Sequence, residues 1–150
     1  MISDRERIEH MLQSISRIED AMKDVSREDF FHSRLLLDAV SFNFAILGEA
    51  ANKVSDEVQA KHGEIPWGDM IGMRNVLIHD YVQLRPEYMW DACKNDLEPL
   101  KRHLMEILIS LPPLDPESRA ALLEAEELKK PGVGKDLKTV DELREDLLSD

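Results

Sequence analysis

The side chains best suited to chemistry lie between positions 74 and 81. Arg74, Asn75, His79 and Tyr81 bring a guanidinium, an amide, an imidazole and a phenol into this short stretch. Arginine stays charged and presents a planar fork of donors that matches phosphate oxygens. Histidine has an ordinary pKa that lets it take and give a proton near neutrality. Together, Arg74 and His79 could hold a phosphodiester and move protons around it.

A helix over this stretch would sort the side chains into two neighbouring strips. At roughly 100° per residue, Arg74 and Tyr81 lie almost one above the other, and Asn75 and His79 share the next strip. The apolar residues 76–78 are then expected to fill the core. Asn75 could fix the imidazole tautomer or hold a substrate oxygen, and Tyr81 could orient a ribose or a phosphate.

The spacing is also compatible with simpler roles. A lone histidine near a helix end is often a capping or solvated residue. Glu49, flanked by small residues, could approach Arg74 or His79 in space. A salt bridge between Glu49 and Lys53, one helical turn further on, is the plainer interpretation. We therefore expect Glu49 to have a supporting role at most.

The order of residues from Arg74 to Tyr81 resembles a known family signature. Arginine, a polar residue, three more residues, histidine, one residue and tyrosine form the motif of the HEPN superfamily, in particular of its HepT-like toxin branch. Further matching segments extend the resemblance over about residues 4–111; they are 48–51, 65–67, 70–75 and Trp90.

This resemblance implies an all-α protein, an up-and-down four-helix bundle that forms a homodimer and cuts RNA without a metal or another cofactor. Arg74 and His79 of both protomers would form the catalytic site in a cleft at the two-fold axis, supported by Asn75, Tyr81 and Glu49. The implied partner is a minimal nucleotidyltransferase antitoxin, which would inactivate the toxin by transferring AMP to Tyr81.

Two other interpretations remain open from the sequence. The chain could be a non-catalytic HEPN module that binds a nucleotide or a partner and serves as the substrate of the nucleotidyltransferase. Alternatively, the motif could be structural in a plain helical scaffold. In that case Arg74 would be buried in a salt bridge with Glu49 or Asp69, and His79 would turn into the protein.

Composition narrows the class of protein. The chain of 150 residues is 43% hydrophobic and 33% charged, which suits one helical domain with an appendage. A net charge of −12 is unusual for a protein that binds RNA, so any positive field must be local. The nearest approach to a basic strip in the sequence is Lys94, Lys101, Arg102 and His103.

Neither a membrane span nor a metal site is expected. No run of about 18 apolar residues occurs, and the polar N-terminus does not look like a signal peptide. Cys93 has no second cysteine to pair with, which fits a cytoplasmic protein and a packing role. The five histidines are scattered and form no cluster with the cysteine.

Hydrophobic periodicity and capping signals predict the helices of a bundle over residues 1–113. The expected helices cover 4–24, 28–54, a short piece at 55–62, the motif helix from Pro66, and a last helix from Pro86 to about 111. Pro99 predicts a kink or break near 95–98, and Gly72 could allow another helix to approach.

The remaining residues, 114–150, have a different character. Two short amphipathic helical pieces are joined by a segment rich in glycine and proline. Pieces of this size cannot build a core alone. We expect them to pack on the bundle, to bind a partner or to stay mobile.

Overall fold

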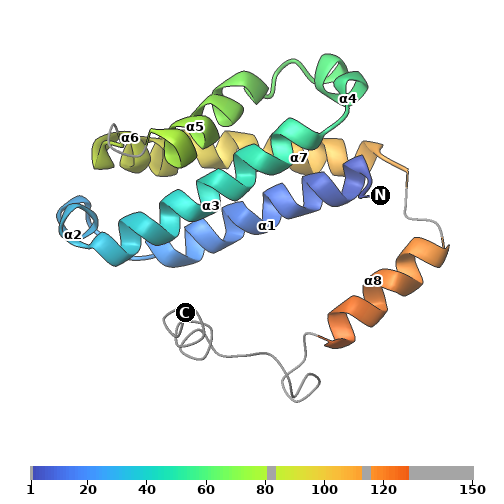
Figure 1. Ribbon diagram of the computed structural model, residues 1–150, viewed down its shortest axis with the longest axis horizontal. Coiled ribbons are helices and arrows are strands. Elements are labelled where there is room, and N and C mark those ends of the chain that lie inside the picture. Colours follow the sequence, from blue (N-terminus) through green and yellow to red (C-terminus); the bar gives the residue numbers. More distant parts are fainter. Residues whose placement is uncertain (1, 81–83, 113–115, 129–150) are drawn as a thin grey trace, which may run out of the picture. The chain divides into compact units, whose positions relative to one another are not determined.

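The computed structural model describes residues 2–80, 84–112 and 116–128, and every regular element within them is helical (Figure 1). The expected all-α class is therefore confirmed. None of the described helices is long and apolar enough to cross a membrane. The chain divides into two compact units, Met1–Pro112 and Pro113–Asp150, which are described separately.

The first unit is a bundle in which α3 (Arg34–Lys53) lies between α1 (Asp4–Met22) and α5 (Trp67–His79). Helix α7 (Leu97–Ser110) packs against α1 on the far side of the bundle (Figure 1). The core consists of apolar side chains at helical spacing. In α1 these are Ile8, Met11, Ile15, Ile18 and Met22, and in α3 they are Leu37, Val40, Phe44 and Leu47.

Serine caps fix where the first helices begin. Ser3 forms the expected capping box, since its Oγ accepts from the Glu6 backbone N–H at 3.2 Å and its own N–H donates to Glu6 Oε2 at 2.6 Å. Such caps satisfy backbone donors that the first turn leaves free. Ser26 caps the short helix α2 (Arg27–His32) in the same manner.

The prediction of a single helix over 28–54 is wrong, because the helix is interrupted at Ser33. This residue has an extended backbone, with φ −109° and ψ 99°, and its Oγ accepts from the Leu36 N–H. It therefore ends α2 and caps α3. Serine favours such a cap over a helix interior because its hydroxyl bonds to nearby backbone groups.

A hydrogen bond of Trp67 and a close helix contact at Gly48 position α5. After the short helix α4 (Asp56–Lys61), the indole of Trp67 is 7% exposed and its Nε1 donates to the His62 carbonyl at 3.0 Å. Gly48 lets α3 approach α5 closely. A Cβ added there would lie 2.5 Å from both the Arg74 Cβ and the Met70 carbonyl oxygen. Gly72, expected to serve this purpose, has open space around it.

The last helix of the bundle is wound unevenly. Helix α6 (Pro86–Asp91) begins at its proline as expected, and a π-helix, η2 (Ala92–Asp96), joins it to α7. Pro99 has no N–H to donate to the carbonyl one turn before it. The expected break near 95–98 therefore takes the form of a wider turn, in which the Leu97 N–H donates to the Ala92 carbonyl.

The second unit contains one described helix, α8 (Pro116–Leu128), which corresponds to the first of the two helical pieces expected there. The second helical piece expected in the tail falls within 129–150 and lies outside the described residues.

Candidate functional site

Arg74 is held in place by a carboxylate from the neighbouring helix. Its Nε and Nη2 donate to Glu49 Oε2 at 2.9 and 2.6 Å, and its side chain is 19% exposed. The close contact at Gly48 brings α3 and α5 together beside this pair. The guanidinium is therefore fixed at the surface of the bundle and is only partly covered.

Glu49 contacts two cations at once. Its Oε1 lies 2.9 Å from Lys53 Nζ, while its Oε2 accepts from Arg74. Both interpretations of Glu49 from the sequence are thus realised in one side chain. Hydrogen bonds from Lys53 and then from Arg74 lower the pKa of the Glu49 carboxyl below 4.5. Glu49 consequently stays ionised at neutral pH.

Asn75 completes the surroundings of Arg74. Its amide oxygen accepts from Arg74 Nη1 at 2.6 Å. An arginine has five N–H groups, of which these bonds to Glu49 and Asn75 use three. Within residues 2–80, 84–112 and 116–128, the other two N–H groups have no acceptor, so they could bind a phosphate oxygen. Asn75 thus supports the guanidinium here rather than the imidazole.

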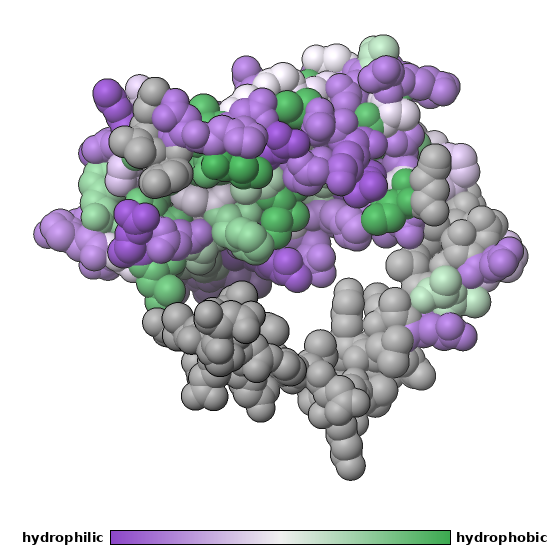
Figure 2. Space-filling view, in the orientation of Figure 1, coloured by the Kyte–Doolittle hydropathy of each residue, from purple (hydrophilic) through white to green (hydrophobic). Residues whose placement is uncertain are grey.

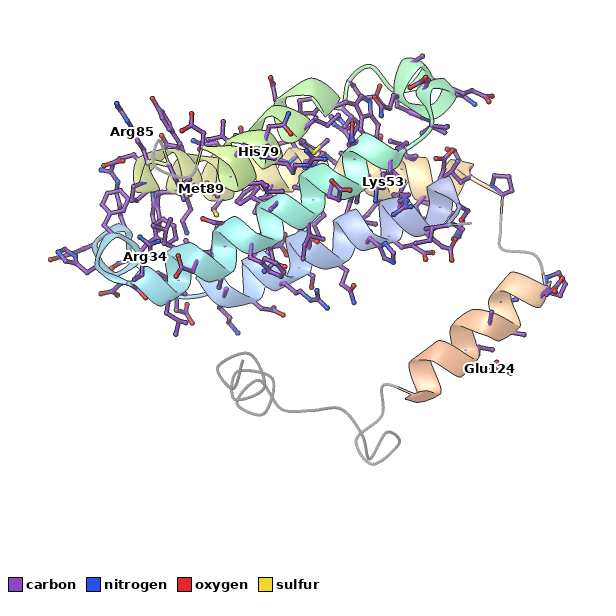
Figure 3. All side chains as sticks on the ribbon, viewed as in Figure 1. Arg34, Lys53, His79, Arg85, Met89 and Glu124 are labelled. Carbon is purple, nitrogen blue, oxygen red and sulfur yellow. The ribbon has the colours of Figure 1, made fainter. Side chains whose placement is uncertain are left out.

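His79 is the last residue of α5 and is exposed. Figure 3 shows it on α5, whereas Lys53 lies on α3, the helix that carries Glu49. Within the described part of the chain, no hydrogen bond or ion pair joins His79 to Arg74. Five residues of helix separate the two side chains by about 140° around the axis. One protomer therefore presents them in different directions.

The expectation that residues 76–78 fill the core is wrong in two of three positions. Leu77 is partly buried, but Val76 is 41% and Ile78 is 52% exposed. Three consecutive helical residues spread over about 200° of the helix surface, so all three cannot face one core. Tyr81, the expected support and modification site, lies outside the described residues.

Ile78 of α5 and two residues of α3 form an exposed apolar surface. Phe42 is 66% and Leu35 is 81% exposed, and these two lie seven residues apart on one side of α3. Phe42 and Ile78 line the same hollow. We call Leu35, Phe42 and Ile78 the α3/α5 apolar face. Figure 2 shows apolar side chains exposed among polar ones on the side of the bundle in view.

The described residues contain no group of three or more His, Cys, Asp or Glu side chains placed to hold a metal ion. Burial raises the pKa of the Cys93 thiol to about 12. Because a thiolate is the reactive form, Cys93 is chemically quiet and packs against the core.

Gly48 is the structural residue that the sequence interpretation missed. It was noted only as a neighbour of Glu49, yet it sets the distance between α3 and α5. The available signal was its place among alanines in a helix, since glycine inside a helix costs about 1 kcal/mol. A close approach of another backbone commonly explains such a residue.

The fold and the motif together define a class: an all-α bundle with a braced arginine and an exposed histidine on one helix. A family model described as "Ribonuclease HepT-like" matches residues 11–107. The chain therefore belongs to the HepT-like ribonuclease family, and the expected resemblance is confirmed.

Curated relatives agree with this membership. The chain is 32% identical over 108 residues to a Caldanaerobacter subterraneus protein described as a candidate RNase. This match covers 72% of this chain and 96% of the relative. It is 31% identical over 99 residues to a Thermococcus cleftensis protein named "Probable ribonuclease HepT", covering 66% of this chain and 90% of the relative.

A third relative is longer. It is a Methanocaldococcus jannaschii protein described as a gamma-glutamylcyclotransferase and candidate RNase, 36% identical over 104 residues. The match covers 69% of this chain but only 47% of that protein, so the chain spans about half of its length. No solved structure gives a significant match.

Proposed function

We propose that the protein is a metal-independent endoribonuclease whose catalytic residues are Arg74 and His79. The proposal is supported by how Arg74 is bonded and how His79 is exposed in a member of a ribonuclease family. Glu49 holds Arg74, two of whose N–H groups have no acceptor among the described residues, and His79 is exposed at the end of the same helix.

The proposed reaction uses the nucleophile that RNA itself supplies. The ribose 2′-oxygen attacks the adjacent phosphorus, and the bond from phosphorus to the 5′-oxygen breaks, which leaves a 2′,3′-cyclic phosphate and a 5′-hydroxyl. His79 takes the proton of the 2′-hydroxyl or delivers one to the leaving oxygen, a contribution of about 10²–10⁴-fold. The free donors of Arg74 stabilise the charge on the phosphoryl oxygens.

A homodimer would bring the two groups into one site. Arg74 and Ile78 are four residues apart and share one strip of α5, and Ile78 belongs to the α3/α5 apolar face. A second copy that covers this face would therefore lie beside Arg74. The His79 of this second copy could then complete the site beside Arg74. A site made by Arg74 and His79 of the same protomer is disfavoured, because the two side chains are about 140° apart around the helix.

The proposal extends to a toxin–antitoxin system in the cytoplasm. The partner would be a minimal nucleotidyltransferase that transfers AMP to Tyr81. A modified Tyr81 would place a bulky, charged group two residues after His79 and block access of RNA. A mass increase of one AMP on the wild type, absent from Tyr81→Phe, tests this step after incubation with the partner and ATP.

The test of the activity is RNA cleavage in excess EDTA. We expect the wild type to cut single-stranded RNA and to leave 2′,3′-cyclic phosphate ends. Arg74→Ala and His79→Ala should each lose at least about 10²-fold in rate. Arg102→Ala, which removes an exposed arginine from α7, is the matched control. Equal cleavage by the wild type and both site variants would remove the assignment.

A further inference from the structure

A groove runs between α1 and α3 next to the candidate site. Its volume is about 350 Å³, and its walls include Arg7, His10 and Arg17 of α1, Phe42 and Glu49 of α3, and Ile78 of α5. Glu49 is the residue that holds Arg74, and Ile78 directly precedes His79. The groove is thus continuous with the residues of the proposed site.

The cations of this groove are uncommitted. Among the described residues, neither Arg7 nor Arg17 forms an ion pair or a side-chain hydrogen bond, and Arg7 Nε is buried without a hydrogen-bond partner. The one carboxylate on the walls, Glu49, is already bound by Arg74 and Lys53. The groove is therefore locally positive in a chain whose net charge is −12.

Four of the five acidic residues of α1 have hydrogen-bond or ion-pair partners among the described residues, and none of the five lines the groove. Glu6 belongs to the capping box, Glu9 pairs with Arg5 at 3.3 Å, and Glu19 pairs with Lys101 at 2.9 Å. Arg7, His10 and Arg17 lie on one side of α1, because they are spaced three and seven residues apart. The side chains of α1 that line the groove therefore include no carboxylate, while the helix as a whole is mixed in charge.

We propose that this groove binds the phosphate backbone of the RNA strand and leads it to Arg74. The proposal rests on the function proposed above and assigns the substrate path that this function requires. Arg7 and Arg17 lie ten residues apart, which is about 15 Å along α1, so they can contact different phosphates of one strand. Guanidinium groups suit this role since they bind phosphate oxygens in a bidentate manner.

The groove also explains how an acidic protein can act on a polyanion. Phosphate contacts supply affinity without reading the sequence. A few uncompensated cations in a concave surface attract the strand locally even when the net charge opposes binding. The basic strip expected from the sequence was Lys94, Lys101, Arg102 and His103. Two of its members are engaged, since Lys101 is paired with Glu19 and Lys94 lies over the Trp90 ring.

The test measures RNA binding separately from cleavage. The full-length His79→Ala protein is the background, because it should bind RNA without cutting it. In this background the double change Arg7→Gln and Arg17→Gln is compared with a matched control, Lys61→Gln and Arg102→Gln. Both pairs remove two positive charges, and Lys61 and Arg102 are exposed outside the groove. Fluorescence anisotropy of a labelled single-stranded RNA gives Kd across a salt titration.

We expect the groove pair to weaken binding about tenfold and to lower the slope of log K against log salt by about 1.4, which is 0.7 for each of two lost phosphate contacts. The control pair should change Kd by less than about twofold. Arg17→Glu is a second variant, and because Arg17 is exposed its weaker binding cannot be ascribed to misfolding.

Two results would overturn the proposal and are distinguishable. If the wild type cleaves RNA while the groove and control variants bind it equally, the groove assignment alone is wrong. This is the result expected if the groove receives an acidic protein segment instead. If the wild type neither binds nor cleaves RNA, the proposed function and the groove assignment both fail.

Discussion

At the scale of single residues, the arginine of the motif is both a structural and a candidate catalytic group. A buried structural salt bridge was one of the interpretations left open by the sequence, and Arg74 does pair with Glu49. That interpretation also required His79 to turn into the protein, but His79 is exposed. Preorganised electrostatic stabilisation requires a guanidinium that is held in place and has donors available, and two donors of Arg74 have no acceptor in the described part of the chain.

Glu49→Gln tests whether this bracing matters. The amide keeps the size of the side chain but loses the charge that orients Arg74, so kcat for RNA cleavage should fall about tenfold, equivalent to ~1.4 kcal/mol. Lys53→Gln is the control, since Lys53 contacts Glu49 without touching Arg74, and it should change kcat by less than about twofold. An unchanged kcat in Glu49→Gln would show that Arg74 does not depend on its partner.

The same pair has a defined pH dependence. The pKa of Glu49 is lowered below 4.5 in the folded protein, so the pair stabilises the fold above that pH. This contribution is lost only as the pH falls through the lowered pKa. The ratio of wild-type to Glu49→Gln activity should therefore stay constant between about pH 5 and pH 8. A ratio that changes steadily across this window would mean that Glu49 titrates there.

At the scale of the helices, a glycine decides how close α3 and α5 can come. Gly48→Ala would place a methyl group 2.5 Å from the Met70 carbonyl oxygen and the Arg74 Cβ. Overpacking of this kind lowers the free energy of unfolding by about 1–3 kcal/mol. Urea denaturation followed by circular dichroism measures the change.

Gly72→Ala is the matched control within α5. Nothing lies within 4 Å of its added Cβ, so replacing a helical glycine should raise the free energy of unfolding by about 0.5–1 kcal/mol. The two substitutions should thus act in opposite directions. If both raised the stability equally, the close contact at Gly48 would not be a real constraint.

The helix boundaries show what local signals can and cannot predict. Caps at Ser3 and Ser26 and the proline at 86 were sufficient to place helix starts, because each satisfies or removes a backbone donor. Ser33 was missed because it lies within a run of apolar residues that suggested one continuous helix. The burial of Ile78 was misjudged since composition alone does not say which side of a helix faces the core.

At the scale of the whole molecule, the α3/α5 apolar face is the surface that the proposed homodimer would bury. The sequence predicted the all-α bundle and the family, but it could not place this face, because it depends on which apolar residues the other helices leave uncovered. Leu35, Phe42 and Ile78 are three of the large apolar residues that the described structure leaves exposed.

Phe42→Glu tests the face directly. A charge there is tolerated in water but not in an apolar interface, where an unpaired charge is costly to bury. We expect sedimentation to report a dimer for the wild type and a monomer for Phe42→Glu. Because Phe42 also lines the groove, sedimentation rather than RNA cleavage is the deciding measurement. Leu123→Glu, on α8 of the second unit, is the control. A Phe42→Glu protein that stays dimeric would place the interface elsewhere.

The measurement that decides the account most directly is rescue in a mixed dimer. Arg74→Ala and His79→Ala chains are co-expressed with different tags, and the heterodimer is isolated by sequential affinity steps. If Arg74 of one protomer acts with His79 of its partner, one of the two sites in the heterodimer keeps both residues. We expect cleavage in EDTA at about half of the wild-type rate, while each homodimeric variant is inactive. A pure heterodimer as inactive as its parents would contradict the shared site.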